Sequence, residues 1–238
     1  MRSVLSAFER EVAKFEARAA ALSPQALADP VRDTDERAAM TLLVSGSLEF
    51  FLQEVTRVYV DEVSSRRAPF DALPPIMRYV HFDGGGRHLM KAAKADMGRI
   101  KAGLQFDFKK AQEICQRLHS TGLPAYVLVW EGFASTDSNA NPETIKTIMN
   151  RLDIDKPWET LERSIPGSAH PLPPGPARAN KLNADLRDFR DARNRCAHGA
   201  ANAAAPGWST LLEYFASAKA VAAGLVQSLE ARISTMPS

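Results

Sequence analysis

The segment of residues 181–200 (KLNADLRDFRDARNRCAHGA), most of which lies in one predicted helix, carries the side chains most suited to chemistry. Its apolar positions recur at helical spacing at Leu182, Leu186 and Phe189, and the next core position in that series is occupied by Arg193. Burying a guanidinium without an anionic partner costs a large amount of free energy. Arg193 is therefore expected either to pair with an acid inside the protein or to face a polar seam between helices or subunits.

A histidine stands near Arg193 at the end of the same helix. His198 comes five residues later and directly before Gly199, a residue type that favours helix termination. Five residues turn a helix by about 140°, so Arg193 and His198 do not share a face. Asn194 does share the face of His198, being four residues away, and its amide could orient the imidazole. A long arginine side chain and a histidine at a helix end can still converge on one anion.

The elements that position these residues are predicted to be helices. Apolar residues at three- and four-residue spacing indicate an amphipathic helix over about residues 2–22. The region from about 33 to 64 is apolar on more than one side, which is typical of a helix at the centre of a bundle. Further helices are expected over about 87–118 with a break near 103, from Pro142 to about 152, from Pro157, over about 177–197 and over about 208–233.

Three other segments interrupt this helical pattern. Asp83-Gly84-Gly85-Gly86-Arg87 lacks the Gly-Lys-Ser/Thr ending of a phosphate-binding loop and is expected to be a flexible loop before a helix. Residues 125–130 fit either a short strand or a buried turn of helix, and the proline-rich residues 166–176 are expected to be a loop. The sequence therefore predicts an all-α protein with four long helices and a middle insertion of short ones.

The composition is that of an ordinary globular protein. The chain has 238 residues, 45% of them hydrophobic, with 30 Lys and Arg against 28 Asp and Glu, which is enough for a core and excludes general disorder. No apolar run approaches the ~20 residues of a membrane span, and acids among the first twenty residues argue against a signal peptide. The net charge of +2 gives no global signal for nucleic-acid binding.

The cysteines and histidines bear on the cellular compartment expected for the protein and on whether a metal site is expected. Cys115 and Cys196 are too few for a disulfide framework and fit a reducing cytoplasm. Cys196 lies on the apolar stripe of its helix, so a packed core thiol is favoured over a nucleophile. His81 and His88 are seven residues apart with no cysteine or third ligand nearby, so no metal site is expected there.

The segment Arg193-Asn194-Arg195-Cys196-Ala197-His198 matches the R-x4-6-H signature of HEPN domains, in the form with a polar residue after the arginine. Its surroundings agree: a long helix containing SGSLEFFLQEV (residues 45–55), an insertion of short helices, the motif near a helix end, and one closing helix. The pattern resembles the RiboL-PSP-HEPN type of stand-alone HEPN protein over about residues 35–235. The resemblance implies an up-and-down helical bundle forming a single domain over 1–238, with a core of about 35–120 and 177–235 and an insertion of about 122–176.

The resemblance also implies an activity. HEPN proteins of this type are metal-independent endoribonucleases of toxin–antitoxin and anti-phage systems, whose site forms where two protomers bring their motifs together. It implies a cytoplasmic homodimer that cleaves RNA, uses no cofactor and does not engage a membrane, with an antitoxin as a further partner. His198 would be the general acid and base, Arg193 would stabilise the phosphate, and Asn194 would support them. The alternative is a non-catalytic HEPN module that binds RNA or a protein partner.

Other charged side chains near the motif have more than one interpretation. Glu49 lies on an otherwise apolar side of an earlier helix and is the best internal partner for Arg193, either within an active site or as an ordinary ion pair between helices. Asp191 could orient a motif side chain or belong to a solvated face. Arg190 and Arg195 could hold flanking RNA phosphates, although neighbouring acids dilute this basic cluster.

Overall fold

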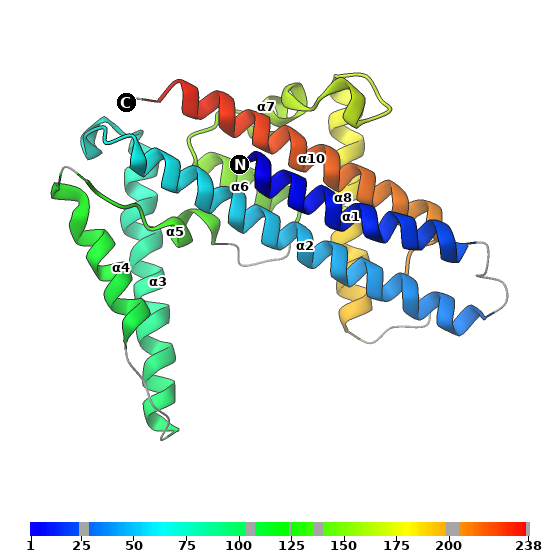
Figure 1. Cartoon of the computed structure of the whole chain (residues 1–238), viewed down its shortest axis with the longest axis horizontal. Helices are drawn as coiled ribbons and strands as arrows, with labels where there is room; N and C mark the ends of the chain where they lie inside the picture. Colours follow the sequence, from blue (N-terminus) through cyan, green and yellow to red (C-terminus); the bar gives the residue numbers. More distant parts are fainter. Residues whose placement is uncertain (24–28, 103–107, 124, 136–139, 199–204, 237–238) are drawn as a thin grey trace. The chain divides into compact units, whose positions relative to one another are not determined.

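The computed structural model of the chain describes residues 1–23, 29–102, 108–123, 125–135, 140–198 and 205–236 (Figure 1). Within these residues every regular element is a helix, so the predicted all-α class is confirmed. The chain divides into two compact units. The first unit comprises Met1–Val55, Thr136–Thr147 and Lys156–Glu230, and the second unit comprises Thr56–Ser135, Ile148–Asp155 and Ala231–Ser238.

The first unit contains the helix that carries the HEPN-like signature. Its core is formed by side chains from four helices and includes the fully buried Val12, Val44, Leu48, Leu186, Phe215 and Leu225. Its elements are α1 (Arg2–Leu22), the first part of α2 (Pro30–Ser65), the first part of α6 (Pro142–Arg151), α7 (Pro157–Ser164), η4 (Gly167–Ala169), α8 (Pro176–Ala197) and most of α10 (Trp208–Ser234).

Helix α1 is joined to both of its long neighbours by ion pairs. Arg18 pairs with Glu36 of α2 at 2.7 Å, and Glu16 pairs with Lys219 of α10 at 2.6 Å. Pairs near the surface contribute only about 0–1 kcal/mol each. Burial of the apolar faces therefore accounts for most of the stability of this arrangement.

The second unit is organised around α3 (Pro75–Lys101). Helix α4 (Lys109–His119) lies alongside α3 (Figure 1), and the short helix α5 (Trp130–Ala134) packs on it as well. The unit also contains η2 (Phe70–Ala72), η3 (Ser120–Gly122) and the ends of α2, α6 and α10. Its buried apolar side chains include Val63, Met77, Ile114, Leu128 and Phe133.

The predicted loop at Gly84-Gly85-Gly86 is wrong, because these residues lie in the interior of α3. A β-carbon at Gly84 would stand 2.7 Å from the Cα atom of Gly132 in α5, so the two backbones touch. The glycines at positions 84 and 132 therefore permit a close contact between two helices. Helix α3 accordingly begins at Pro75, well before the expected start near residue 87.

Residues 125–129 are neither a strand nor a turn of helix; they run irregularly to the start of α5. Side chains of the second unit satisfy three of their backbone N–H groups. The N–H of Val127 donates to Ser120 Oγ at 3.0 Å. The N–H of Leu128 donates to Ser64 Oγ at 3.2 Å, and that of Val129 donates to His81 Nδ1 at 3.1 Å. These bonds let a buried irregular segment do without a strand partner.

Candidate active site

The buried stripe of α8 passes beside Arg193 and not through it. The side chains of Leu182, Leu186 and Phe189 are buried as expected, but the next core position is Ala192, which is fully buried. Arg193 is half-buried at the edge of that stripe. The expectation of a core position at Arg193 was therefore wrong by one residue, because the helical repeat is 3.6 and steps of three and four alternate along a face.

Asn194 contacts both of the other motif residues. Its side-chain Oδ1 accepts a hydrogen bond from Arg193 Nη1 at 3.4 Å. Its backbone carbonyl accepts the N–H of His198 at 3.2 Å, the bond that closes the last turn of α8. His198 is exposed at the C-cap of the helix, where its imidazole is open to an incoming ligand.

Cys196 connects the last turn of α8 to α2. Its thiol makes a hydrogen bond with Thr41, whose own hydroxyl donates to the carbonyl oxygen of Arg37 at 2.8 Å. Burial raises the pKa of the Cys196 thiol, which keeps it protonated at neutral pH. Cys196 is half-buried, so it lies at the edge of the core and not inside it as predicted, and its contacts give this thiol no character of a nucleophile.

A polar cluster that the sequence did not reveal anchors the chain after the motif. The side chain of Arg37 is largely buried, pairs with Asp33 at 2.8 Å, and donates to the carbonyl oxygens of Ala205 and Pro206. The indole N–H of Trp208 donates to the same Asp33 at 2.6 Å. The spacing of four between Asp33 and Arg37 was the available signal, but their partners lie about 170 residues away.

The supporting residues predicted around the motif have separate surroundings. Asp191 accepts hydrogen bonds from Arg190 at 2.7 and 2.9 Å, so this carboxylate is paired with Arg190. Arg195 is exposed, and Glu49 is half-buried on α2. The predicted pairing of Glu49 with Arg193 stays a prediction, as do the RNA contacts of Arg190 and Arg195.

Neither a metal-binding cluster nor a membrane-spanning helix occurs in the part of the chain that the structure describes. No group of three His, Cys, Asp or Glu side chains is placed there to hold a metal ion. No described helix is both long enough and apolar enough to cross a bilayer. His81, one of the two histidines considered for a metal, is fully buried in the second unit.

The helical fold and the arginine, polar residue and terminal histidine of α8 define a HEPN domain protein. A family model described as RiboL-PSP-HEPN matches residues 9–231. The chain therefore belongs to the RiboL-PSP-HEPN family, and the resemblance seen in the sequence is confirmed. No curated protein matches the chain. No solved structure matches it either.

Proposed function

We propose that this protein is a metal-independent endoribonuclease that acts as a toxin or in defence against phage. The observation that carries the proposal is the end of α8, where Asn194 contacts Arg193 through its side chain and the exposed His198 through its backbone. Membership of the HEPN family supports it, because HEPN domains are commonly ribonucleases. Both motif residues belong to the first unit.

The proposed reaction uses the 2′-hydroxyl of RNA as its nucleophile. An imidazole takes the 2′-OH proton while the bond from O2′ to phosphorus forms, and an imidazolium protonates the leaving 5′-oxygen while its bond to phosphorus breaks. The products are a 2′,3′-cyclic phosphate and a 5′-hydroxyl. Arg193 supplies donors in a fixed fork as negative charge builds on the phosphate. DNA lacks the 2′-OH and is not a substrate.

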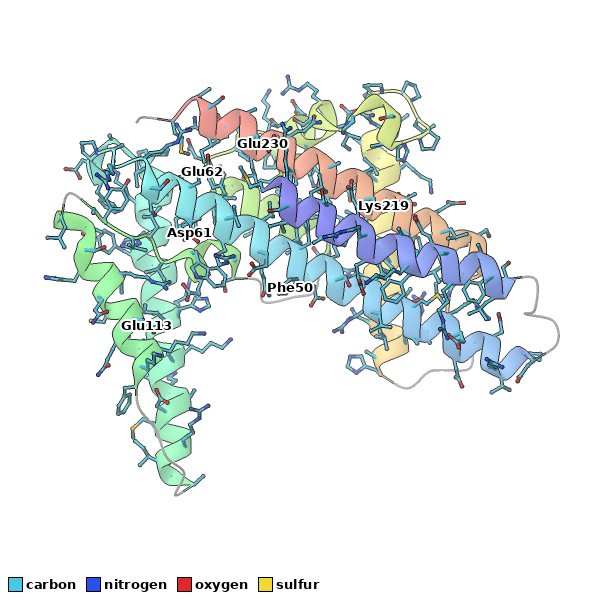
Figure 2. All side chains as sticks on the ribbon, viewed as in Figure 1. Phe50, Asp61, Glu62, Glu113, Lys219 and Glu230 are labelled. Atoms are coloured by element: carbon cyan, nitrogen blue, oxygen red, sulfur yellow. The ribbon has the colours of Figure 1, made fainter. Side chains whose placement is uncertain are left out.

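The proposed site needs two histidines, and a homodimer supplies one His198 from each protomer. An exposed apolar surface of the first unit is available for a contact between protomers. Leu43 and Phe50 on α2 are 54% and 65% exposed, and Phe50 is labelled in Figure 2. They border a groove of about 660 Å³ between α1 and α2, with Val4 and Phe8 on its other side. We propose that a second copy covers this groove.

The test compares parent protein with His198→Ala on labelled single-stranded RNA in EDTA. We expect the substitution to lower the cleavage rate by about 100-fold or more, the usual share of general acid–base catalysis. Parent products should end in a cyclic phosphate and a 5′-hydroxyl. Circular dichroism and sedimentation check that fold and assembly are retained.

His119→Ala is the matched control, because His119 is an exposed histidine at the end of α4. It should cut RNA at the parent rate. Two results contradict the proposal: His198→Ala that cuts as fast as the parent, or an RNA with a 2′-deoxy group at the cleavage site that is cut as fast as unmodified RNA. RNA that is bound and never cut would indicate the non-catalytic module instead.

A further inference from the structure

Helix α3 exposes an apolar stripe on the side away from its packing contacts. Its buried side carries Met77, His81 and Gly84, which contact the rest of the second unit. The opposite side carries Tyr79, Met90 and Met97, at spacings of eleven and seven residues that keep them on one face of a helix. These three residues are 62%, 59% and 48% exposed. Large apolar side chains exposed along one face of a helix mark a candidate interaction surface.

A row of cations runs beside this stripe. Arg87, Lys94 and Lys101 are seven residues apart, so they lie in one line along the helix. Lys94 and Lys101 each follow a methionine of the stripe by four residues, which places the two rows next to each other. A hollow of about 520 Å³ lies on this face, lined by Gly86, Arg87, Met90, Lys91 and Lys94.

The positive charge of α3 and α4 is stronger than that of the whole protein. Residues 75–119 contain nine Lys and Arg against four Asp and Glu, a net +5, whereas the entire chain carries only +2. Among these acids, Asp83 is paired with Arg87 at 2.5 Å and Asp96 is buried. Within the described residues, Lys91, Lys94 and Lys101 are exposed and have no ion pair.

Charges of both signs act on His88, which is half-buried on α3. Burial lowers its pKa most, Glu131 raises it, and Lys91, Lys110 and Arg87 lower it. The excess of Lys and Arg over acids in residues 75–119 therefore favours an anionic ligand along α3.

We propose that the face formed by Tyr79, Arg87, Met90, Lys94, Met97 and Lys101, named the α3 face, binds single-stranded RNA. Phosphates lie along the cation row, and unpaired bases stack on the aromatic ring and the thioethers of the stripe. The choice of RNA as occupant rests on the proposed function. A duplex keeps its bases stacked inside, so it has no unpaired bases that could pack on the apolar stripe.

The dimensions of the α3 face fit a short segment of RNA. Fourteen residues from Arg87 to Lys101 rise about 21 Å along the helix. This equals about six stacked nucleotides at about 3.4 Å each. Successive cations are seven residues, or about 10.5 Å, apart, so they would contact about every third phosphate and leave the bases free to meet the stripe.

The experiment measures binding of a fluorescein-labelled 12-nucleotide RNA by anisotropy over a range of salt concentrations. All proteins carry His198→Ala, so that the RNA stays intact. The test variant adds Arg87→Gln, Lys94→Gln and Lys101→Gln. The control adds Arg10→Gln, Lys156→Gln and Arg163→Gln, which remove the same charge from exposed positions of the first unit.

We expect the test variant to bind about tenfold or more weakly at low salt. Its slope of log affinity against log salt should fall by about 2, since each lost phosphate contact on a single strand removes about 0.7. The control should bind within about twofold of the protein with His198→Ala alone. Tyr79→Ala, on the same background, should weaken binding about fivefold or more without changing the salt slope, because it removes stacking and no charge.

Three results would overturn the proposal. In the first, the test variant and the control bind RNA equally well. In the second, a duplex RNA competes as well as the single strand. In the third, the three glutamine substitutions leave RNA binding intact and abolish only binding to vesicles containing an anionic phospholipid, which would make the α3 face a membrane contact.

Failure of this proposal is distinguishable from failure of the proposed function. Binding is measured without cleavage, and cleavage by the parent protein is scored separately. If the test variant binds RNA more weakly but the parent cuts no RNA, the nuclease proposal is refuted and RNA binding by the α3 face stands. If the test variant binds RNA as well as the control but the parent cuts RNA and needs His198 to do so, RNA binding by the α3 face is refuted and the nuclease proposal stands.

Discussion

Two histidines of this protein occupy opposite surroundings. His198 is exposed at the end of α8, where it can meet a ligand. His81 is fully buried in α3, and its Nδ1 accepts the backbone N–H of Val129 at 3.1 Å. Burial lowers the pKa of His81 to about 4, so this imidazole is neutral in the folded protein. One histidine is open to solvent, and the other holds an irregular segment in place.

The buried His81 predicts a dependence of stability on pH. Its pKa is lower in the folded protein, at about 4, than the value of about 6.5 in an unfolded chain. Below pH 6.5 the unfolded state binds a proton that the folded state does not, so stability falls as the pH drops toward 4. The contribution is at most about 3 kcal/mol. Urea unfolding between pH 7 and pH 4 measures it.

A variant isolates His81 from the other titrating groups. His81→Asn keeps an acceptor near the position of Nδ1 and cannot be protonated in this range. We expect it to be less stable than the parent at pH 7 and to have a flatter dependence of stability on pH. Equal slopes for His81→Asn and the parent would show that the proton uptake belongs to other groups.

A fully buried arginine does occur in this protein, but at a residue other than the one expected from the sequence. Arg178 near the start of α8 is fully buried, and its guanidinium pairs with Glu162 of α7 at 3.0 Å. The same carboxylate accepts the backbone N–H of Gly175 at 2.6 Å. A buried charge needs such a partner. Nothing local in the sequence marked Arg178, because its acid is sixteen residues away across a proline-rich segment.

At the scale of elements, local patterns predicted most helices and failed where tertiary contacts decide. The helices α1, α6, α8 and α10 begin and end close to the expected residues, and α7 begins at the expected Pro157, because amphipathic spacing and an initial proline are properties of the segment itself. Helix α3 was divided wrongly at its three glycines. Three consecutive glycines in a sequence indicate a loop. Only the contact with Gly132 shows that Gly84 permits two helices to pack closely.

The three consecutive glycines of α3 give a matched pair of substitutions. Gly84→Ala would place a β-carbon 2.7 Å from the backbone of α5 and should destabilise the protein by about 1–3 kcal/mol. A β-carbon at Gly86 meets nothing within 4 Å. Gly86→Ala should therefore stabilise the protein by up to about 1 kcal/mol, because alanine favours helix. Denaturant unfolding of both variants measures the difference, and equal stabilities would contradict the close contact between α3 and α5.

At the scale of the whole molecule, the small net charge conceals an uneven distribution. The net +5 of residues 75–119 exceeds the +2 of the chain, so the remaining residues are net negative. Near-neutral composition indicated that no basic surface covers the protein. It did not indicate where the basic residues gather, since that depends on which side of α3 is buried. Local charge of this kind is sufficient to attract an anionic polymer to one surface.

The proposed homodimer is also a property of the whole molecule, and Phe50 provides its test. Phe50 borders the groove between α1 and α2, so Phe50→Glu would put a charge into an apolar contact between protomers. The expected result is a dimer weakened by about 30-fold or more, because a central aromatic contact is typically worth about 2 kcal/mol or more. Sedimentation equilibrium measures the dissociation constant, and RNA cleavage should fall with the fraction of dimer.

Val31→Glu is the control, because Val31 is another apolar residue of α2 with similar exposure, 68%, and it does not line the groove. This variant should dimerise and cleave like the parent. A Phe50→Glu protein that remains dimeric would place the contact between protomers on another surface. A parent that is monomeric while it cuts RNA would contradict the two-protomer site itself, since one His198 would then have to serve as both base and acid.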